Sequence, residues 1–266
     1  MLKKGLSQHL IKDRNILEKI ITLTSICRDD IVVEIGPGQG DLTRCIAERA
    51  GFVYAIEIDN SLKAYLDQIE SIYPNVHVTY DDFLNTSLSQ YKTNRRIKVI
   101  GNIPYKITGP ILFKLIKERE IIESAYLTVQ KEIAERVVSK THKRTYGALS
   151  VNLQILSEVK MLFTLKPTVF IPPPKVESAF ISIIFKDDEL KTEEDLIEFV
   201  KLCFQHKRKY MKNNLSKRYG ADRISDLYDY MGFSSNIRAE EIEPHNFKKM
   251  YMFLNAQDED LFVQRK

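Results

Sequence analysis

The chain has 266 residues, of which 44% are apolar, and a formal net charge of +4. This length allows one large domain, or one with a small appendage, and the apolar fraction is typical of a globular protein with a core. No apolar run approaches the roughly 18 residues that span a bilayer, and the N-terminus lacks the apolar stretch of a signal peptide. The three cysteines and five histidines show no metal-ligand spacing. We expect a cytoplasmic protein with no membrane association and no metal.

The first ~185 residues alternate strand-like and helix-like patterns, which predicts a layered α/β fold. The runs expected to form strands are 31–35, 52–58, 76–80, 97–100, 125–129 and 176–185. Because the last run alternates, we expect it to be antiparallel and at an edge. The expected helices are 13–26, one with Asp41 as N-cap, one capped by Ser61, 111–117 after Pro110, and 131–139.

A charged break at 186–189 ends this alternation, and only helical periodicity follows. The expected helices of this part are 196–204, 210–219, 224–231 and 247–254. We therefore expect two domains, 1–187 and 188–266, the second being small and all-helical.

A glycine-rich segment, 34–40, lies between the first expected strand and the helix that follows it. Its G-x-G-x-G spacing permits a sharp turn and a close ligand approach. Glu57 ends the second strand and can accept both hydroxyls of a ribose, and Asp82, after the third, can accept from an adenine amino group. Carboxylates at successive strand ends predict a nucleoside-type cofactor, and NAD and S-adenosylmethionine both remain open.

The tetrapeptide Asn102-Ile103-Pro104-Tyr105 follows the fourth expected strand. The exocyclic amine of adenine is a poor nucleophile because its lone pair is delocalised into the ring. An amide oxygen and a nearby backbone carbonyl can accept both amine hydrogens and free that lone pair. Pro104 stiffens the turn and Tyr105 can stack on the base. This pattern indicates chemistry at an adenine amine.

A basic run lies between residues 201 and 218, with seven basic residues and no acidic one. A stripe of this kind fits a phosphate backbone. Its members are Lys201, Lys207, Arg208, Lys209, Lys212, Lys217 and Arg218.

These residues together resemble the rRNA adenine N6-dimethyltransferase superfamily, and within it the KsgA family that acts on small-subunit rRNA. Segments 7–11, 34–40, 102–105, 170–179 and 204–215 carry the resemblance along nearly the whole chain. Lys106 departs from it, since Asn is usual after the tyrosine. The resemblance implies a Rossmann-like, S-adenosylmethionine-dependent α/β methyltransferase sheet with helices on both faces.

The resemblance also implies roles for particular residues. The cofactor would be bound by Gln8, His9, Ile11, Gly36, Gly38, Glu57, Asp82 and Asn102. Catalysis would rest on Asn102, Pro104, Tyr105 and Phe170, with Phe170 stacking on the target base opposite Tyr105. The RNA-binding residues would be Lys207, Arg208, Lys209 and Lys212.

The implied reaction is dimethylation of N6 of two adjacent adenosines in the 3′-terminal hairpin loop of small-subunit rRNA, by a monomer whose partner is the small ribosomal subunit. Two alternatives stay open. One is an Erm-type enzyme acting on large-subunit rRNA, and the other is a non-catalytic factor for small-subunit assembly.

Overall fold

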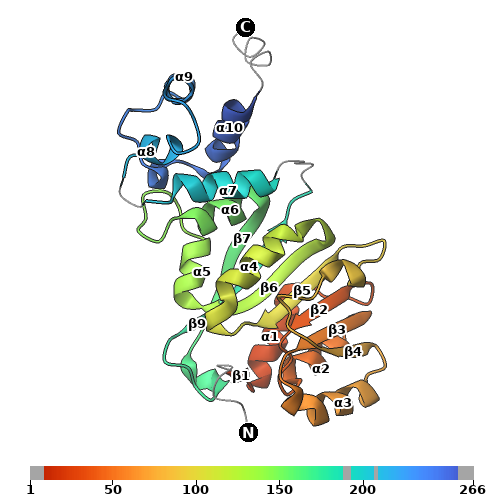
Figure 1. Ribbon diagram of the computed structural model, residues 1–266. Coiled ribbons are helices and arrows are strands. Elements are labelled where there is room, and N and C mark those ends of the chain that lie inside the picture. Colours follow the sequence, from red (N-terminus) through yellow and green to blue (C-terminus); the bar gives the residue numbers. More distant parts are fainter. Residues whose placement is uncertain (1–8, 188–192, 207–208, 257–266) are drawn as a thin grey trace. The chain divides into compact units, whose positions relative to one another are not determined.

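Figure 1 shows the computed structural model, which describes residues 9–187, 193–206 and 209–256. The chain forms two compact units. One comprises 1–134 and 157–187, and the other comprises 135–156 and 188–266. A boundary falls after residue 187, as expected. In addition, residues 135–156 group with the C-terminal helices, so the chain passes between the two units more than once.

The first unit is built on a seven-stranded sheet with the order β4-β3-β2-β5-β6-β9-β7. Its parallel strands are β2 (Ile31–Ile35), β3 (Phe52–Glu57), β4 (Val76–Tyr80), β5 (Ile97–Asn102) and β6 (Ile122–Gln130). The order reverses between β2 and β5, since the chain moves outward to β4 and then returns to the other side of β2. Open α/β sheets bind ligands outside the carboxyl ends of strands at such a switch point.

The antiparallel end of the sheet corrects one expectation. β9 (Ser178–Phe185) is antiparallel as expected, but it lies between β6 and β7 and is not an edge strand. The edge is β7 (Ser157–Leu165), which the sequence pattern did not reveal. α6 and β7 follow one another within 148–165 with no glycine or proline between them, so no local signal separates helix from strand.

Helices cover both faces of this sheet, which confirms the expected α/β class (Figure 1). Buried side chains of α1 (Arg14–Thr24), α2 (Asp41–Ala47) and α3 (Lys63–Ile72) share one core cluster with Val32 and Val53. α4 (Thr108–Lys117) buries another apolar face outside that cluster, and α5 (Lys131–Val137) follows β6.

Two helix starts differ from expectation. The cap of α2 is Gly40 in a left-handed conformation, and Asp41 is the first helical residue. Asp59, not Ser61, caps the turn before α3, because its carboxylate accepts the Ser61 N–H at 3.0 Å. At α1, the Asp13 carboxylate accepts the N–H groups of the first turn in the usual way.

A second sheet, of two short strands, pairs residues 10–11 with residues 170–171. β1 (Leu10–Ile11) pairs antiparallel with β8 (Phe170–Ile171), so that Ile11 lies opposite Phe170. Short 3-10 turns also occur in this unit, at Asn60–Leu62, Leu88–Tyr91, Tyr105–Ile107, Arg119–Ile121 and Pro167–Val169.

A buried ion pair lies on β5. Lys98 Nζ is 2.8 Å from Asp30 Oδ2, and their side chains are 10% and 11% exposed. The ammonium also donates to the Ser25 carbonyl at 3.3 Å. Burial would raise the pKa of Asp30, but the hydrogen bond and charge of Lys98 outweigh it and lower this pKa.

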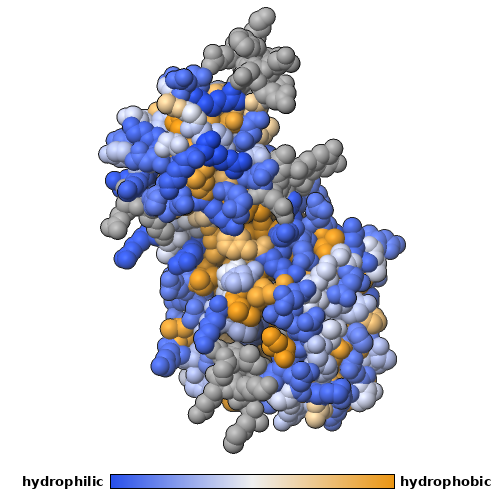
Figure 2. Space-filling view, in the orientation of Figure 1, coloured by the Kyte–Doolittle hydropathy of each residue, from blue (hydrophilic) through white to orange (hydrophobic). Residues whose placement is uncertain are grey.

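The second unit is helical. Its helices are α6 (Ala148–Leu156), α7 (Glu193–Cys203), α8 (Lys212–Leu215), α9 (Ala221–Met231) and α10 (Pro244–Asn255), with a 3-10 turn at Ala239–Glu241. The Phe204 ring stacks on the Phe247 ring, with centroids 5.6 Å apart, and meets the Tyr146 ring edge-on, with centroids 5.9 Å apart. The Tyr146 hydroxyl donates to the Ile242 carbonyl at 2.8 Å. The visible face of this unit is mostly hydrophilic (Figure 2). Within the described ranges, no helix has the length and apolar character needed to cross a membrane.

Candidate active site

The loop after β2 holds glycines in backbone conformations that other residues rarely adopt. Gly36 and Gly38 have φ angles of +65° and +61°. A Cβ on Gly38 would lie 2.6 Å from the Leu10 side chain, whereas one on Gly36 would meet no atom within 4 Å. Gly38 thus allows the N-terminal segment to approach the loop, and Gly36 borders open space.

Glu57, the last residue of β3, is buried with 2% of its surface exposed. Its Oε2 accepts the Gly38 N–H at 3.1 Å and its Oε1 accepts the Asp59 N–H at 2.8 Å. Burial raises the pKa of Glu57, and these two hydrogen bonds partly offset that effect. A carboxylate has about four acceptor positions, so each oxygen keeps capacity for a ligand hydroxyl.

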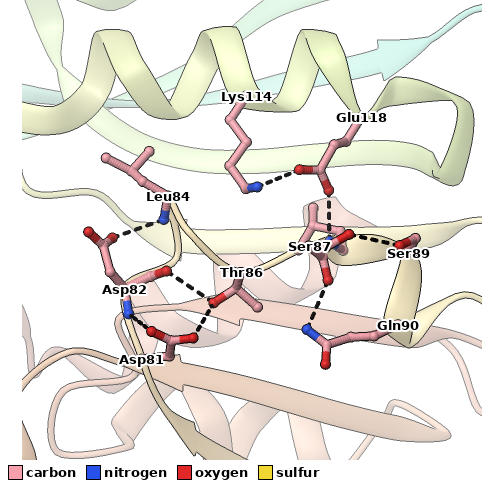
Figure 3. A network of polar contacts seen from close by, with 10 residues as sticks. Asp81, Asp82, Leu84, Thr86, Ser87, Ser89, Gln90, Lys114 and Glu118 are labelled. Atoms are coloured by element: carbon pink, nitrogen blue, oxygen red, sulfur yellow. Dashed lines mark hydrogen bonds and ion pairs between the residues drawn. The ribbon is translucent and has the colours of Figure 1, made fainter.

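Asp82 lies in the loop after β4, and its two oxygens differ (Figure 3). Oδ1 accepts the Leu84 N–H at 2.9 Å, which folds the loop back on itself. Oδ2 has no hydrogen-bond donor among the residues that the structure describes. One oxygen of Asp82 therefore holds the loop, and the other can accept from an adenine amino group.

A second set of contacts anchors this loop to α4, the helix that follows the Asn102 segment (Figure 3). Glu118 Oε2 accepts the Leu88 N–H at 2.7 Å, and Glu118 Oε1 accepts a charge-assisted hydrogen bond from Lys114. Lys114 also lies over the Phe83 ring, 5.7 Å from its centroid. The loop that carries Asp82 is thereby anchored to the helix that follows the Asn102–Tyr105 segment.

Asn102 ends β5, and the N-terminal segment fixes its amide. The Asn102 Nδ2 group donates to the His9 carbonyl. This hydrogen bond fixes the orientation of the amide, whose acceptor atom, Oδ1, can then take a hydrogen from a substrate amine.

Tyr105 is fixed at its hydroxyl, which lies 2.8 Å from the Ser178 hydroxyl of β9. Burial raises the pKa of Tyr105, with the Ser178 hydrogen bond opposing it, so the phenol is neutral at physiological pH. Its ring faces that of His9, with centroids 5.6 Å apart.

These groups surround one pocket of about 220 Å³. Of the expected site residues, it brings together His9, Gly36, Gly38, Glu57, Asp82, Asn102, Pro104 and Tyr105. The charged side chains in its described lining are the carboxylates of Glu57, Asp81 and Asp82 and a single cation, Lys106, which is exposed.

A smaller cavity of about 30 Å³, lined by Glu34, Gly36 and Asn102 among others, adjoins the same loop. Glu34 is 1% exposed, and its Oε2 has no hydrogen-bond partner in the described part of the chain. Burial, together with the smaller effect of the nearby Glu57 and Asp41 charges, raises the pKa of Glu34 to about 8. A buried, unpaired carboxylate oxygen suits a cationic ligand group such as an ammonium. Ile11 lines this cavity and not the larger one.

Phe170 is buried in this structure. It is 2% exposed and belongs to the core cluster, and its backbone pairs with that of Ile11. It does not line the larger pocket. Its stacking on a base opposite Tyr105 stays a prediction.

The other expected residues fall in two groups. Gln8, Lys207 and Arg208 lie outside the described residues. Lys209 and Lys212 are exposed on the helical unit, and Lys212 Nζ lies 6.0 Å from the centre of the Tyr210 ring. Their binding of RNA stays a prediction.

Phe83, expected beside the adenine ring of the cofactor, lines the pocket, but sequence reasoning missed the other apolar walls. They are formed by Ile35, Ile56, Ile58, Leu84 and Ile107, among others. Ile58 is 52% exposed directly after Glu57, and an apolar residue just past a strand end is a signal that could have identified it. The support of Tyr105 by Ser178 has no local signal, because the two residues are distant in sequence.

The donors and acceptors fit a nucleoside cofactor with a cationic amino acid end. Glu57 suits a ribose, the free oxygen of Asp82 suits an adenine amine, and the buried Glu34 oxygen suits an ammonium. The pocket walls are apolar, and the buried acidic group of Glu34 lies beside the glycine loop, where it disfavours the negative charge of a pyrophosphate. Of the two cofactors left open, S-adenosylmethionine matches this set.

Comparison with known proteins gives the same answer. The family model "Ribosomal RNA adenine dimethylase" matches residues 1–256. A Ribosomal RNA small subunit methyltransferase A of Ureaplasma urealyticum is 34% identical over 265 residues, covering 97% of this chain and 94% of the relative. The protein of the same name from Francisella tularensis is 38% identical over 257 residues, covering 95% and 97%.

Solved structures agree in fold. A dimethyladenosine transferase from Plasmodium falciparum superposes with a TM-score of 0.81 at 27% identity, covering 91% of this chain and 96% of the other. The 23S rRNA methyltransferase ErmE gives a TM-score of 0.72 at 27% identity, covering 93% and 100%. The chain belongs to the ribosomal RNA adenine dimethylase family and is an rRNA adenine dimethyltransferase that uses S-adenosylmethionine.

Proposed function

We propose that this enzyme dimethylates N6 of two adjacent adenosines in the 3′-terminal hairpin loop of 16S rRNA, within the small ribosomal subunit. One observation carries the chemistry: Asn102 and Tyr105 face the same pocket as Glu57 and Asp82. The full-length relatives named for the small subunit support the choice of RNA.

The cofactor site would be assembled from three strand ends and the glycine loop. Glu57 would accept the ribose hydroxyls, Asp82 Oδ2 the adenine amine, and Glu34 the methionyl ammonium. S-adenosylmethionine supplies a methyl group on a sulfonium, which is transferred by in-line displacement. Gly36, where a Cβ would meet no atom, leaves room for that end of the cofactor.

The target amine would be activated by the Asn102 segment. Asn102 Oδ1 would accept one N6 hydrogen, since the hydrogen bond from Nδ2 to the His9 carbonyl fixes the direction in which the amide points. The Pro104 carbonyl accepts the Ile107 N–H at 3.1 Å and the Thr108 hydroxyl at 3.4 Å, which makes the Ile103 carbonyl the freer acceptor for the second hydrogen. With both hydrogens held, the N6 lone pair would be free to attack the methyl carbon, the bond from that carbon to the sulfonium sulfur would break and leave a neutral thioether, and the N6 proton would pass to solvent.

Loop adenosines are already partly unstacked, which lowers the cost of extruding the base, ordinarily a few kcal/mol. Pro104 stiffens the turn, and Tyr105 supplies one stacking face. Two transfers on one base require that the monomethylated amine return to the same acceptors, with its remaining hydrogen on Asn102.

The helical unit would hold the enzyme on the subunit, with Lys207, Arg208, Lys209 and Lys212 on phosphates. The exposure of Lys209 and Lys212 supports this assignment. Since every described residue of the pocket comes from one compact unit of one chain, we also propose that the enzyme acts as a monomer, in the cytoplasm with its ribosomal substrate.

Labelled S-adenosylmethionine offered to unmethylated small subunits, large subunits and naked rRNA tests this proposal, with modified bases mapped by primer extension. We expect label in the small subunit, at two adjacent adenosines near the 3′ end of its rRNA. Label only in large-subunit RNA would replace this function with the Erm type. If the protein binds small subunits but no sample becomes labelled, the remaining alternative is a non-catalytic factor for small-subunit assembly.

A further inference from the structure

Lys106 directly follows the Asn102–Tyr105 segment, and the proposed function gives it no role. It lies in the 3-10 turn Tyr105–Ile107, between β5 and α4, and it lines the larger pocket. It is exposed, and it is the single cation in the described lining, whose other charged side chains are three carboxylates. Lysine also departs from the asparagine that is usual at this place in the family. A cation therefore stands at the exposed rim of an otherwise acidic pocket.

The ammonium group of Lys106 has no counter-charge. Lysines on the neighbouring elements do have one. Lys114 of α4 is paired with Glu118, and Lys131, directly after β6, is paired with Glu177, with 2.7 Å between Nζ and Oε2. The Lys106 side chain makes no hydrogen bond, ion pair or ring contact with any residue in the described parts of the chain. Its charge is therefore available to a ligand that brings a negative group to the pocket.

An RNA substrate brings such a group to this place. Each nucleotide carries a phosphate, and the base of an extruded adenosine reaches Asn102 only if its own backbone lies at the pocket. The carboxylates of the pocket repel that backbone. Two unit charges 4 Å apart interact by about 1 kcal/mol in water, and more strongly where water is excluded. One lysine beside the phosphate thus offsets the repulsion from carboxylates that lie further away.

We propose that Lys106 binds a phosphate of the target nucleotide and thereby helps to place its base on Tyr105, within reach of Asn102. The inference rests on the proposed function, since the phosphate is that of the rRNA. Lys106 and Tyr105 are adjacent, so the ammonium that binds the backbone and the ring that stacks on the base act on the same nucleotide. The four-carbon stem of lysine is flexible. The same contact therefore serves each of the two adenosines in turn.

The cofactor offers a competing partner for Lys106, because its methionyl end carries a carboxylate. S-adenosylmethionine as a whole is a net cation, with an ammonium, a sulfonium and one carboxylate. Removing a lysine that binds this carboxylate would weaken cofactor binding. Removing a lysine that binds only RNA would leave cofactor binding unchanged or slightly tighter, since a nearby positive charge is lost. The Kd for S-adenosylmethionine therefore separates the two partners.

Three variants carry the test. Lys106→Gln removes the charge and keeps much of the stem, and Lys106→Arg keeps the charge. Lys92→Gln is the matched control, because Lys92 is exposed, lines neither cavity and precedes β5, at the other end of that strand from Lys106. All three substitutions are at exposed positions, so the fold should be retained. The readouts are kcat/KM for unmethylated small subunits at several salt concentrations, and the Kd for S-adenosylmethionine.

We expect Lys106→Gln to lower kcat/KM about fivefold at low salt, the upper range for an exposed ion pair. The slope of log kcat/KM against log salt concentration should become shallower by about 0.7 to 0.9, the value of one phosphate contact. Lys106→Arg should keep the wild-type slope, and Lys92→Gln should match the wild type in both respects. The cofactor Kd should stay within about twofold in all of them.

Three results would overturn the phosphate contact. One is an unchanged salt slope for Lys106→Gln, and another is an equal loss of slope in Lys106→Arg. The third is a weaker cofactor Kd for Lys106→Gln, which would assign the lysine to the methionyl carboxylate. The wild type reports separately on the proposed function. If it labels only large subunits, that function fails, and the same variants are compared on that RNA, for which the phosphate contact makes the same prediction.

Discussion

Replacing Glu34 by glutamine tests the buried carboxylate beside the glycine loop. Glu34 is 1% exposed, and burial raises its pKa from an ordinary value of 4.5 to about 8. Below pH 4.5 the carboxyl is protonated in both the folded and unfolded states. Between pH 4.5 and 8 the folded state binds a proton that the unfolded state releases, so the contribution of Glu34 to stability falls as pH rises, and this fall is complete above about pH 8.

The size of this effect follows from linkage. The slope approaches 1.36 kcal/mol per pH unit, so the Glu34 contribution falls by about 2 kcal/mol between about pH 5.5 and 7.5. Glutamine fills the same space and does not ionise. We therefore expect the free energy of unfolding of Glu34→Gln to fall by about 2 kcal/mol less than that of the wild type between these two pH values.

Urea unfolding of the cofactor-free protein at the two pH values measures the difference directly. Glu158→Gln is the matched control, because Glu158 is exposed on β7 and its hydrogen bond to Lys160 lowers its pKa. The contribution of Glu158 is lost only as pH falls below its ordinary range. Equal pH dependence of Glu34→Gln and wild type would refute the assignment of a raised pKa.

Cofactor binding gives a second measurement on the same variant. An ammonium beside Glu34 favours the ionised carboxylate, so binding near neutral pH should release a proton. The binding enthalpy should then vary with the ionisation heat of the buffer. Glu34→Gln should abolish this variation and weaken binding about tenfold or more, the value of one charge-assisted hydrogen bond. Unchanged affinity would remove Glu34 from the cofactor site.

Further predictions concern the catalytic segment, the basic run and the buried ion pair. Asn102→Ala should abolish methyl transfer while the cofactor Kd measured by calorimetry stays within a few-fold, and normal transfer would contradict its role. Removing the charges of Lys209 and Lys212 should weaken small-subunit binding. It should also reduce the slope of log K against log salt concentration by about 1 for each lost phosphate contact. An unchanged slope would exclude these lysines from the interface. Asp30→Asn should destabilise the fold by about 3 kcal/mol in urea unfolding, because it leaves Lys98 without its nearest buried counter-charge. A loss well below 1 kcal/mol would mean that the half-exposed Glu123 carboxylate, 3.7 Å from Lys98 Nζ, suffices.

The inner parallel strands could be predicted from sequence because they are largely buried on both faces and appear as short, mostly apolar runs, whereas β4, at the edge, could be predicted from its alternation of buried and exposed residues. The bounds of β2 and β4 match the expected 31–35 and 76–80. The place of β9 could not be predicted, because a strand's neighbours depend on the rest of the chain. β7 was missed because nothing in 148–165 marks where α6 ends.

The site divides in the same way. Glu57, Asp82 and Asn102 could be brought together from sequence because parallel strands converge at one edge of a sheet. The burial of Phe170 could not be predicted, because it depends on β1 and β8, which have two residues each and no periodicity to detect. The His9–Tyr105 contact has the same origin, since the β1–β8 pairing brings residue 9 to the pocket.

The central claim is that Asn102 and its neighbours activate the N6 amine of rRNA adenosines for two transfers each. Mass spectrometry of nucleosides from small subunits treated with the enzyme and S-adenosylmethionine tests it most directly. We predict N6,N6-dimethyladenosine, with two such residues adjacent in one oligonucleotide from the 3′-terminal hairpin, and none with Asn102→Ala. A methyl group on any other atom, or dimethyladenosine formed by Asn102→Ala, would contradict this account.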